Sequence, residues 1–159
     1  MGIVRPHLWF DDQAVPAAQF YASVIPRTTI HSVATAPPGT PGLAEGAEFI
    51  VELTIDGLRA TFLNGGPHFT LDEAFSFVLD CQDQAEVDHY WDVLTADGGR
   101  PSQCGWLVDK FGVSWQVVPV QLDDVMSRPD AEGVARAMAV MLTMGKLDID
   151  ALEAAYAGR

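Results

Sequence analysis

Residues 105–119 read GWLVDKFGVSWQVVP and predict two strands joined by a tight turn. The turn falls at 109–112, DKFG, because an Asp side chain can bond its own backbone and Gly tolerates a positive φ. The next residues, 113–118, are rich in β-branched and aromatic side chains, which favour a strand. Gln116 is an amide inside this apolar strand, and it is the first indication of a binding site.

Working outward from this hairpin, the chain contains one helical pattern twice. In each copy apolar side chains recur at i, i+3, i+4 and i+7, which predicts an amphipathic helix. The two stripes are Ala17, Phe20, Tyr21 and Val24, and then Val87, Tyr90, Trp91 and Leu94. Each member of the second stripe lies 70 positions after its counterpart, and both stripes have two central aromatic residues. An internal duplication accounts best for this pattern.

Strand signals surround both helices in the same order. The strands expected are 3–10, 28–36, 47–55 and 58–63, and then 74–80, about 100–102, 105–108 and 113–118. Asp56-Gly57 is a strong two-residue hairpin signal. Asp11-Asp12 offer an N-cap to the first helix, and Asp83 with Glu86 predicts a capping box for the second. Each half is therefore expected to be a βαβββ module.

The remaining residues, 120–159, predict a helical extension. Asp130 and Asp148 are suited to cap its last two helices. Val134, Met138, Met141 and Leu142 form a stripe there, and we interpret it as a packing face over the sheet or at a subunit interface.

Composition limits the possible partners. The chain has 159 residues, is 48% apolar and carries a formal net charge of −13, so nucleic acid and anionic membranes are not expected partners. No apolar run approaches the ~20 residues that a bilayer span needs. The N-terminal residues lack the pattern of a signal peptide. Cys81 and Cys104 show no metal-ligand spacing, which favours reduced thiols and a cytoplasmic protein.

Several stretches resemble a known family. They are LWFDDQA at 8–14, FY at 20–21, SFVLDC at 76–81, EVDHYWDVL at 86–94, QCGWLVDKFGVSWQVVP at 103–119, ARAM at 135–138 and KLDIDALEAA at 146–155. With two βαβββ modules, they resemble the vicinal oxygen chelate superfamily, which includes glyoxalases, extradiol dioxygenases and antibiotic-resistance proteins. More narrowly, the chain resembles the PhnB-like branch, labelled 3-demethylubiquinone 3-methyltransferase.

The resemblance implies an α+β fold. Two modules, 3–66 and 74–119, would pair over 3–119 as a half-open, eight-stranded, barrel-like sheet around a pocket, followed by the helical tail at 120–159. It also implies a homodimer. The methyltransferase label finds no support in the residues, because no glycine-rich turn follows a first strand to hold a nucleotide-like cofactor.

Metal-binding members of the superfamily hold one divalent ion with a His at the start of each module and a Glu in the last strand. The resemblance places Gln116 at the Glu position and Ala74 at the second His position. The first His position falls at Pro6, or at His7 after a shift of one residue. Gln is a poor substitute for a carboxylate on a hard cation. We therefore expect no metal cofactor, although a divalent metal is the alternative.

The alternation of side chains along a strand indicates which residues would line the candidate site. If Gln116 faces the pocket, Ser114 and Val118 share its side, and Cys104 shares the side of Trp106. Ala74, Ser76 and Val78 would line the pocket from the fifth strand, and the first strand presents either His7 and Trp9 or Pro6, Leu8 and Phe10. The substrate-binding candidates are Trp9, Ser76, Cys104, Trp106, Ser114 and Gln116, with His7 the best candidate for a catalytic base.

Other roles for these residues stay open. Gln116 can be a buried residue bonded to backbone, the two tryptophans can be plain core, and Cys104 can be a small buried hydrophobe. His7 can be an ordinary strand histidine, whereas His31, His68 and His89 are expected on the surface.

Two functions follow from this sequence. The first is a small-molecule-binding protein that takes an aromatic or amphipathic organic ligand without the superfamily's metal. The second is a glyoxalase- or dioxygenase-type enzyme acting on a small organic substrate. A structural dimer with a vestigial pocket is a third hypothesis.

Overall fold

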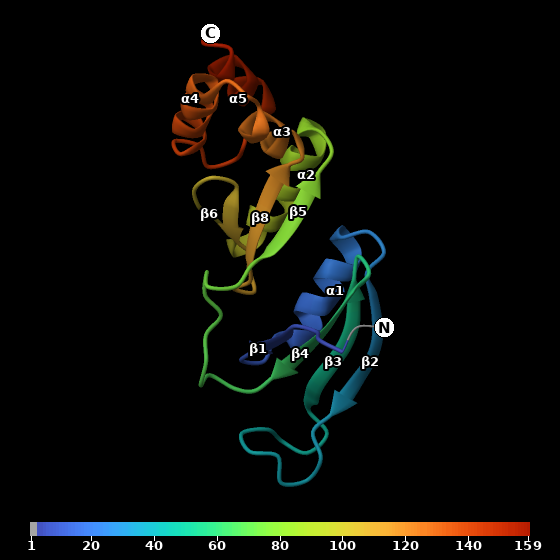
Figure 1. Cartoon of the computed structure of the whole chain (residues 1–159). Coiled ribbons are helices and arrows are strands. Elements are labelled where there is room, and N and C mark those ends of the chain that lie inside the picture. Colours follow the sequence, from blue (N-terminus) through green and yellow to red (C-terminus); the bar gives the residue numbers. More distant parts are fainter. Residues whose placement is uncertain (1–2) are drawn as a thin grey trace. The chain divides into compact units, whose positions relative to one another are not determined.

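The structure is a computed structural model that describes residues 3–159. The chain divides into two compact units, Met1–Leu71 and Asp72–Arg159 (Figure 1). Within the described residues, no helix has the length and apolar character needed to cross a bilayer.

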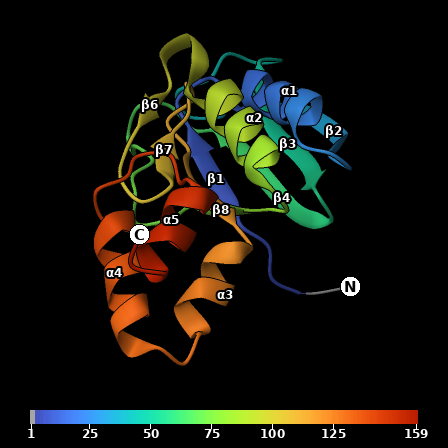
Figure 2. The same ribbon diagram turned by 90° about the horizontal axis from the view of Figure 1, so that it is seen from above.

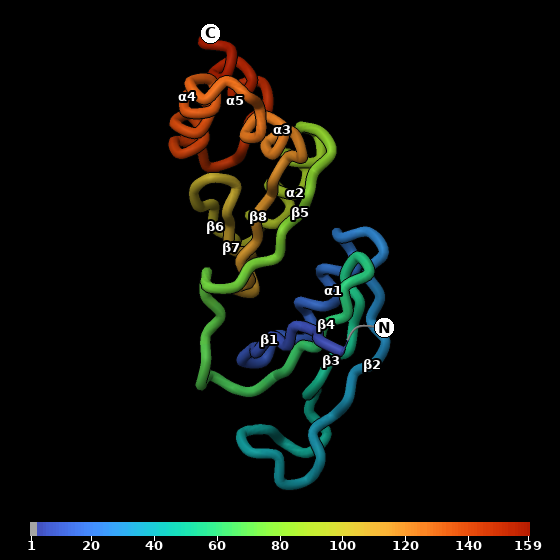
Figure 3. The backbone as a smooth tube through the Cα atoms, viewed as in Figure 1, coloured from blue at the N-terminus to red at the C-terminus, as the bar shows by residue number. Residues whose placement is uncertain are grey.

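The first unit is one helix packed on a four-stranded sheet. Its elements are β1 (His7–Phe10), α1 (Ala14–Val24), β2 (Thr29–Thr35), β3 (Glu48–Ile55) and β4 (Leu58–Asn64). The strand order is β1-β4-β3-β2, with β1 parallel to β4 and the other pairs antiparallel. The long connection from β2 to β3 extends beyond the sheet as a loop (Figure 3).

The second unit repeats this topology. Its sheet and first helix comprise β5 (Phe77–Cys81), α2 (Gln84–Thr95), the 3₁₀ turn η1 (Ala96–Gly98), β6 (Arg100–Pro101), β7 (Trp106–Val108) and β8 (Ser114–Pro119). The order β5-β8-β7-β6 matches that of the first sheet, with β5 parallel to β8. The predicted duplication and the α+β class with two βαβββ modules are confirmed.

The repeated helical stripe forms the two cores. Tyr21 and Trp91, which are counterparts 70 positions apart, are both buried, as are Ala17 and Val87. Tyr21 meets Phe62 of β4 edge-on, with 5.8 Å between ring centroids. Each helix therefore covers one face of its sheet and leaves the opposite face open.

A buried carboxylate closes the hairpin between β7 and β8. Asp109 is 3% exposed, and its Oδ1 accepts hydrogen bonds from the backbone N–H groups of Phe111 (2.9 Å) and Val113 (3.1 Å). Its Oδ2 accepts from the Trp115 indole at 2.9 Å. The predicted turn is confirmed, and its Asp also anchors a core tryptophan.

The expected cap of the first helix is wrong. The helix begins at Ala14, beyond Asp11 and Asp12, and its N-cap Gln13 makes no side-chain cap hydrogen bond. The Ala14 N–H donates instead to Oδ1 of Asn64 at 2.8 Å, and the Asn64 amide donates to the Glu48 carbonyl. A side chain 50 positions away thus provides a hydrogen-bond acceptor for an N–H group at the start of the helix.

The second helix starts as predicted. The Asp83 side chain accepts from the Glu86 N–H at 2.9 Å. The Glu86 carboxylate accepts from the backbone of Gln82, one residue before the position a capping box uses.

The first, fifth and seventh strands begin later than the sequence patterns suggested. The first begins at His7, because only residues 7–10 pair with β4. The fifth begins at Phe77 rather than 74, since the side chain of Asp72 turns the chain by accepting from the Ala74 N–H. The seventh begins at Trp106, which leaves Cys104 in a turn and not in a strand.

The tail forms three helices, α3 (Gln121–Ser127), α4 (Ala131–Met141) and α5 (Ile149–Tyr156), which gather into one cluster (Figure 2). Asp130 and Asp148 cap α4 and α5 as predicted. Met138 and Leu142 of the predicted stripe are exposed in the single chain, so they do not pack over the sheet, and their place at a subunit interface stays a prediction. The face of α4 that is buried is narrow and carries Gly133 and Ala137, where small side chains allow α5 to approach.

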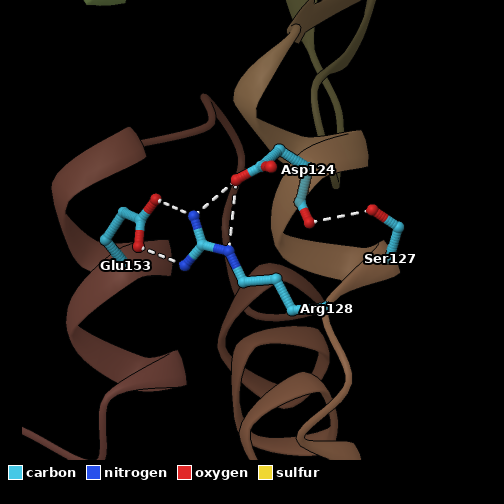
Figure 4. Close-up of polar contacts among 4 residues, drawn as sticks. All are labelled: Asp124, Ser127, Arg128 and Glu153. Atoms are coloured by element: carbon cyan, nitrogen blue, oxygen red, sulfur yellow. Dashed lines mark hydrogen bonds and ion pairs between the residues drawn. The ribbon is translucent and has the colours of Figure 1, made fainter.

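One arginine joins α3 to α5. The Arg128 guanidinium donates to both carboxylate oxygens of Glu153 at 2.6 Å and also to Asp124 (Figure 4). Hydrogen bonding to Arg128 lowers the pKa of the Glu153 carboxyl below its ordinary value. The two-point hydrogen bonding between the Arg128 guanidinium and the Glu153 carboxylate therefore favours the charged form of the carboxylate.

The tail is bound to the second sheet. Gln84 of α2 donates to the Leu147 carbonyl at 3.0 Å and accepts from the Ile149 N–H at 2.9 Å. The N–H groups of Cys104 and Gly105 donate to the carbonyls of Met144 and Gly145, both at 2.8 Å. The tail thus supports the turn that enters β7.

Gly105 has φ +83°, and a Cβ there would lie 2.8 Å from the Val117 carbonyl oxygen and 3.1 Å from Leu147 Cδ1. Gly112 has nearly the same backbone, φ +84°, but a Cβ there would meet nothing within 4 Å. Substitutions at the two glycines therefore distinguish the cost of a positive φ from the cost of a close contact.

We expect Gly105→Ala to destabilise the protein by about 2–4 kcal/mol, because a positive φ and overpacking both oppose the methyl group. Gly112→Ala serves as the matched control and should cost about 1 kcal/mol from φ alone. Urea unfolding followed by tryptophan fluorescence measures both. Equal losses for the two variants would contradict the close approach at Gly105.

The Arg128–Glu153 pair predicts a pH-dependent stability. Because the folded pKa of Glu153 is lowered, its contribution is present above the ordinary carboxyl range and is lost as pH falls through the folded pKa. Glu153→Gln should therefore destabilise the chain at pH 7, and this effect should shrink progressively as the pH falls below the ordinary carboxyl range. Glu45→Gln, in the exposed β2–β3 loop, is the control. Thermal melts across this pH range test the prediction, and a constant difference would refute it.

Candidate functional site

The open face of the second sheet brings several predicted residues together. Gln116 lies at the centre, paired with Val78 on β5 and with Trp106 on β7. Trp115 and Val117 point to the opposite side, where they are buried with the core. The predicted alternation along this strand is therefore present.

Gln116 makes a side-chain contact rather than the backbone contact considered as its alternative. Its Nε2 donates to the Ser76 hydroxyl at 2.9 Å, and its side chain is half-buried. Ser76 precedes β5, so this bond ties the entry of β5 to the middle of β8. Because an amide carries two N–H donors and a two-lone-pair acceptor, one bond leaves capacity for a ligand.

Ser114 contributes a second polar group two residues from Gln116. It is 2% exposed, and within residues 3–159 its Oγ has no hydrogen-bond partner. A buried hydroxyl without a partner costs on the order of 1–3 kcal/mol. Ser114 is not among the residues that line the hollow beside Trp106.

A hollow of about 330 Å³ lies beside Trp106. Its lining residues are Glu73, Ser102, Gln103, Cys104 and Trp106. The turn that shapes it is traced by the backbone between β6 and β7 (Figure 3), and Cys104 there has a left-handed φ of 56°. Cys104 therefore reaches the vicinity of Trp106 through this turn and not through strand alternation.

Sequence reasoning missed the contribution of the tail to this hollow. The carbonyls of Met144 and Gly145 hold Cys104 and Gly105 in place. The available signal was the glycine at 105, between Cys104 and Trp106, because Gly at a strand entry often marks a close backbone approach.

The other cysteine, Cys81, has a thiol of low reactivity. Burial raises the pKa of the Cys81 thiol to about 12, and the nearby carboxylates of Glu86, Asp80 and Asp83 add to the effect. A thiol with so high a pKa has almost no nucleophilic thiolate at neutral pH. Cys81 thus belongs to the core beneath α2.

The predicted residues of the first strand lie in the other unit. Leu8 and Phe10 are each 3% exposed and belong to the core, so His7 and Trp9 lie on the open face of the first sheet. The alternative set of Pro6, Leu8 and Phe10 is therefore wrong. His7 is exposed.

Trp9 is held in place on that open face. Its indole Nε1 donates to the Gly66 carbonyl at 2.8 Å, and its ring meets Phe69 edge-on with 5.0 Å between centroids. His31, His68 and His89 are exposed, as predicted.

The resemblance places Ala74 and Gln116 at two of the superfamily's metal-ligand positions. Ala74 has no donor atom, and Gln116 offers a neutral amide already bonded to Ser76. Throughout residues 3–159, no three side chains of His, Cys, Asp or Glu are grouped to hold a metal ion.

The chain is similar to several known proteins. The family model for 3-demethylubiquinone-9 3-methyltransferase matches residues 3–118. A PhnB protein from Bacillus cereus, described as a 3-demethylubiquinone-9 3-methyltransferase, is 27% identical, with a TM-score of 0.66 over 75% of this chain and 100% of its own. No curated protein matches the chain.

Two more distant structures share the fold. A protein from Pseudomonas aeruginosa is 18% identical and has a TM-score of 0.60 over 75% of this chain and 98% of its own. The fosfomycin resistance protein FosX from Listeria monocytogenes is 16% identical and has a TM-score of 0.55 over 80% of this chain and 98% of its own. Together with the duplicated βαβββ topology, the match over 3–118 shows that the chain belongs to the PhnB-like, 3-demethylubiquinone-9 3-methyltransferase family of the vicinal oxygen chelate superfamily.

Proposed function

We propose that this protein binds a small organic molecule on the open face of its second sheet and does so without the superfamily's metal ion. The observation that carries the proposal is the Gln116–Ser76 hydrogen bond next to Trp106 and its hollow. An aromatic wall with a few fixed polar atoms suits a mostly apolar ligand that carries one or two hydrogen-bonding groups.

The polar groups define what the ligand must offer. Gln116 can donate and accept, and the buried Ser114 hydroxyl lacks a partner within the described chain. A carbonyl or hydroxyl group on the ligand would pair with the Gln116 amide, while an aromatic or aliphatic body would pack on Trp106. Cys104 would contact the ligand as an apolar neighbour.

The proposed lack of a metal rests on residue chemistry. A divalent ion in this superfamily needs a carboxylate where Gln116 stands and an imidazole where Ala74 stands. Removing two such ligands leaves at most His7, and one imidazole does not hold a metal tightly.

A glyoxalase- or dioxygenase-type enzyme is the alternative function. It is favoured by the position of His7, which lies exposed on the open side of β1, where a base can reach a substrate. A homodimer is proposed as well, and the exposed Met138 on α4 and Leu142 directly after it support an apolar contact between chains.

We expect a thermal-shift screen of aromatic and amphipathic compounds to find a ligand whose affinity depends on Trp106. Trp106→Ala should weaken that ligand by ~10-fold or more, since aromatic contacts in a pocket carry much of the binding energy. Tyr90→Ala is the matched control, because Tyr90 is a half-buried aromatic residue on α2. Gln116→Leu should also weaken binding while keeping the side chain's size. Ligands insensitive to both site variants would contradict this location.

Elemental analysis tests the metal-free site. Purified, untagged protein should hold no stoichiometric metal, even after dialysis against zinc, nickel and manganese. A Gln116→Glu variant provides the comparison, because it restores the carboxylate of the metal-binding members. Stoichiometric metal in the unaltered protein would refute the proposal and make metal-dependent chemistry the leading function.

A further inference from the structure

The hollow beside Trp106 has two walls, which come from separate segments of the second unit. One wall is the turn of residues 102–106, which enters β7, and we call it the turn wall. The other wall is Glu73, which lies in the segment before β5. Because β8 lies between β5 and β7 in the sheet, the segment before β5 reaches across to the β7 side for Glu73 to line the hollow.

Backbone hydrogen bonds hold the turn wall in one shape. The Ser102 N–H donates to the Trp106 carbonyl at 2.9 Å, and the Trp106 N–H donates to the Gln103 carbonyl at 3.0 Å. The two residues at the centre of the turn, Cys104 and Gly105, have φ values of 56° and 83°, as in the tight turns that join antiparallel strands. Trp106 is therefore presented by a fixed backbone, and little order has to be gained when a ligand packs against its half-buried ring.

The residues on both sides of Glu73 are held as well. The Asp72 side chain accepts a hydrogen bond from the Ala74 N–H at 3.0 Å, which closes a local turn around Glu73. Further along, the Ser76 hydroxyl accepts from Gln116 Nε2 at 2.9 Å and so ties the segment to β8. The segment that carries Glu73 is thus attached to the same sheet as the turn wall.

The hollow carries one negative charge that no cation of the protein neutralises. Of the described residues that line it, Glu73 alone is charged, and its carboxylate has no hydrogen bond or ion pair to any other described residue. Lys146 of the tail is paired instead with Asp88 of α2 at 2.7 Å. Arg100 lies on β6 and does not line the hollow. The Glu73 carboxylate is therefore available to a ligand.

A carboxylate and an indole that line one hollow together favour an organic cation. The face of an aromatic ring attracts an ammonium group, and that of Trp does so more strongly than that of Tyr or Phe. The carboxylate adds Coulomb attraction and accepts charge-assisted hydrogen bonds from N–H donors. An anionic ligand would be repelled by Glu73 and by the formal net charge of −13 on the chain.

We infer that this hollow takes an organic cation, whose protonated amine pairs with the Glu73 carboxylate and whose apolar body packs on the Trp106 indole. Ser102 and Gln103 provide further oxygen acceptors in the lining for the remaining N–H groups of the ammonium. Glu73 is then the residue that determines the charge of the ligand. The inference rests on the proposed function, because it names the class of ligand for the same site.

Two compounds of the same size test the inference: benzylamine, which is protonated at neutral pH, and benzyl alcohol, which is neutral. Each is titrated into ¹⁵N-labelled full-length protein at constant ionic strength. Shifts should concentrate at the amides of 102–106 and at the Trp106 indole N–H, and benzylamine should bind more tightly. Glu73→Gln should weaken benzylamine by roughly 3- to 10-fold, as the loss of an ion-paired hydrogen bond predicts, and leave benzyl alcohol unchanged.

The ratio of the two affinities makes the test independent of folding, because a misfolded variant would lose both compounds together. Glu132→Gln is the matched control, since it removes the same charge from α4 of the same unit and should leave the ratio unchanged. Trp106→Ala should weaken both compounds, because both carry the ring that packs on the indole.

Benzylamine that binds no more tightly than benzyl alcohol would overturn the inference, as would equal effects of Glu73→Gln and Glu132→Gln on the ratio. In either case shifts at 102–106 would still support the proposed function. An absence of benzylamine shifts at these residues would also overturn the inference, and the thermal-shift screen for ligands that depend on Trp106 then decides the proposed function separately.

Discussion

The hydrogen bonds of the buried Asp109 carboxylate are the constraint on which the second unit depends. A carboxylate removed from water is stable only when donors surround it, and the turn amides and the Trp115 indole supply them. This arrangement fixes both the turn and the side of β8 that enters the core. Because side chains alternate along a strand, burying Trp115 sends Gln116 to the open face, where the register sets it between Val78 and Trp106.

The duplicated modules share topology but differ in how their open faces are used. In the first, charged side chains and hydroxyls cover one end of the sheet, and Trp9 is held near the other by the segment after β4. In the second, Trp106 lies beside Gln116, which is hydrogen bonded to Ser76, and the segment between α4 and α5 supports the turn beside Trp106. Duplication thus preserved the cores under the helices, where packing limits change, while the open faces diverged.

This divergence bears on function. The family label names a methyl transfer, and the superfamily includes metal enzymes, yet the side chains at the expected ligand positions are an amide and a methyl group. What the chain offers instead is two chemically different surfaces on two similar sheets. Gln116 lies beside Trp106 on the open face of the second sheet, whereas Arg5, Glu52 and Thr61 are hydrogen bonded to one another on that of the first. A shared fold therefore leaves the ligand to be decided by a few open-face residues.

The sequence by itself determined the duplicated βαβββ order, the two amphipathic helices, the hairpin at Asp109 and the alternation that exposes Gln116. These features depend on periodicity and turn chemistry, which are local and can be recognised in a single sequence. Only the tertiary structure decided that Asn64 caps α1, that Cys104 lies in a turn, that the tail carbonyls hold Gly105, and that Arg5 meets Glu52 and Thr61. Each of these joins residues far apart in the chain. Such contacts follow from strand register and close packing, which no spacing within a single segment encodes.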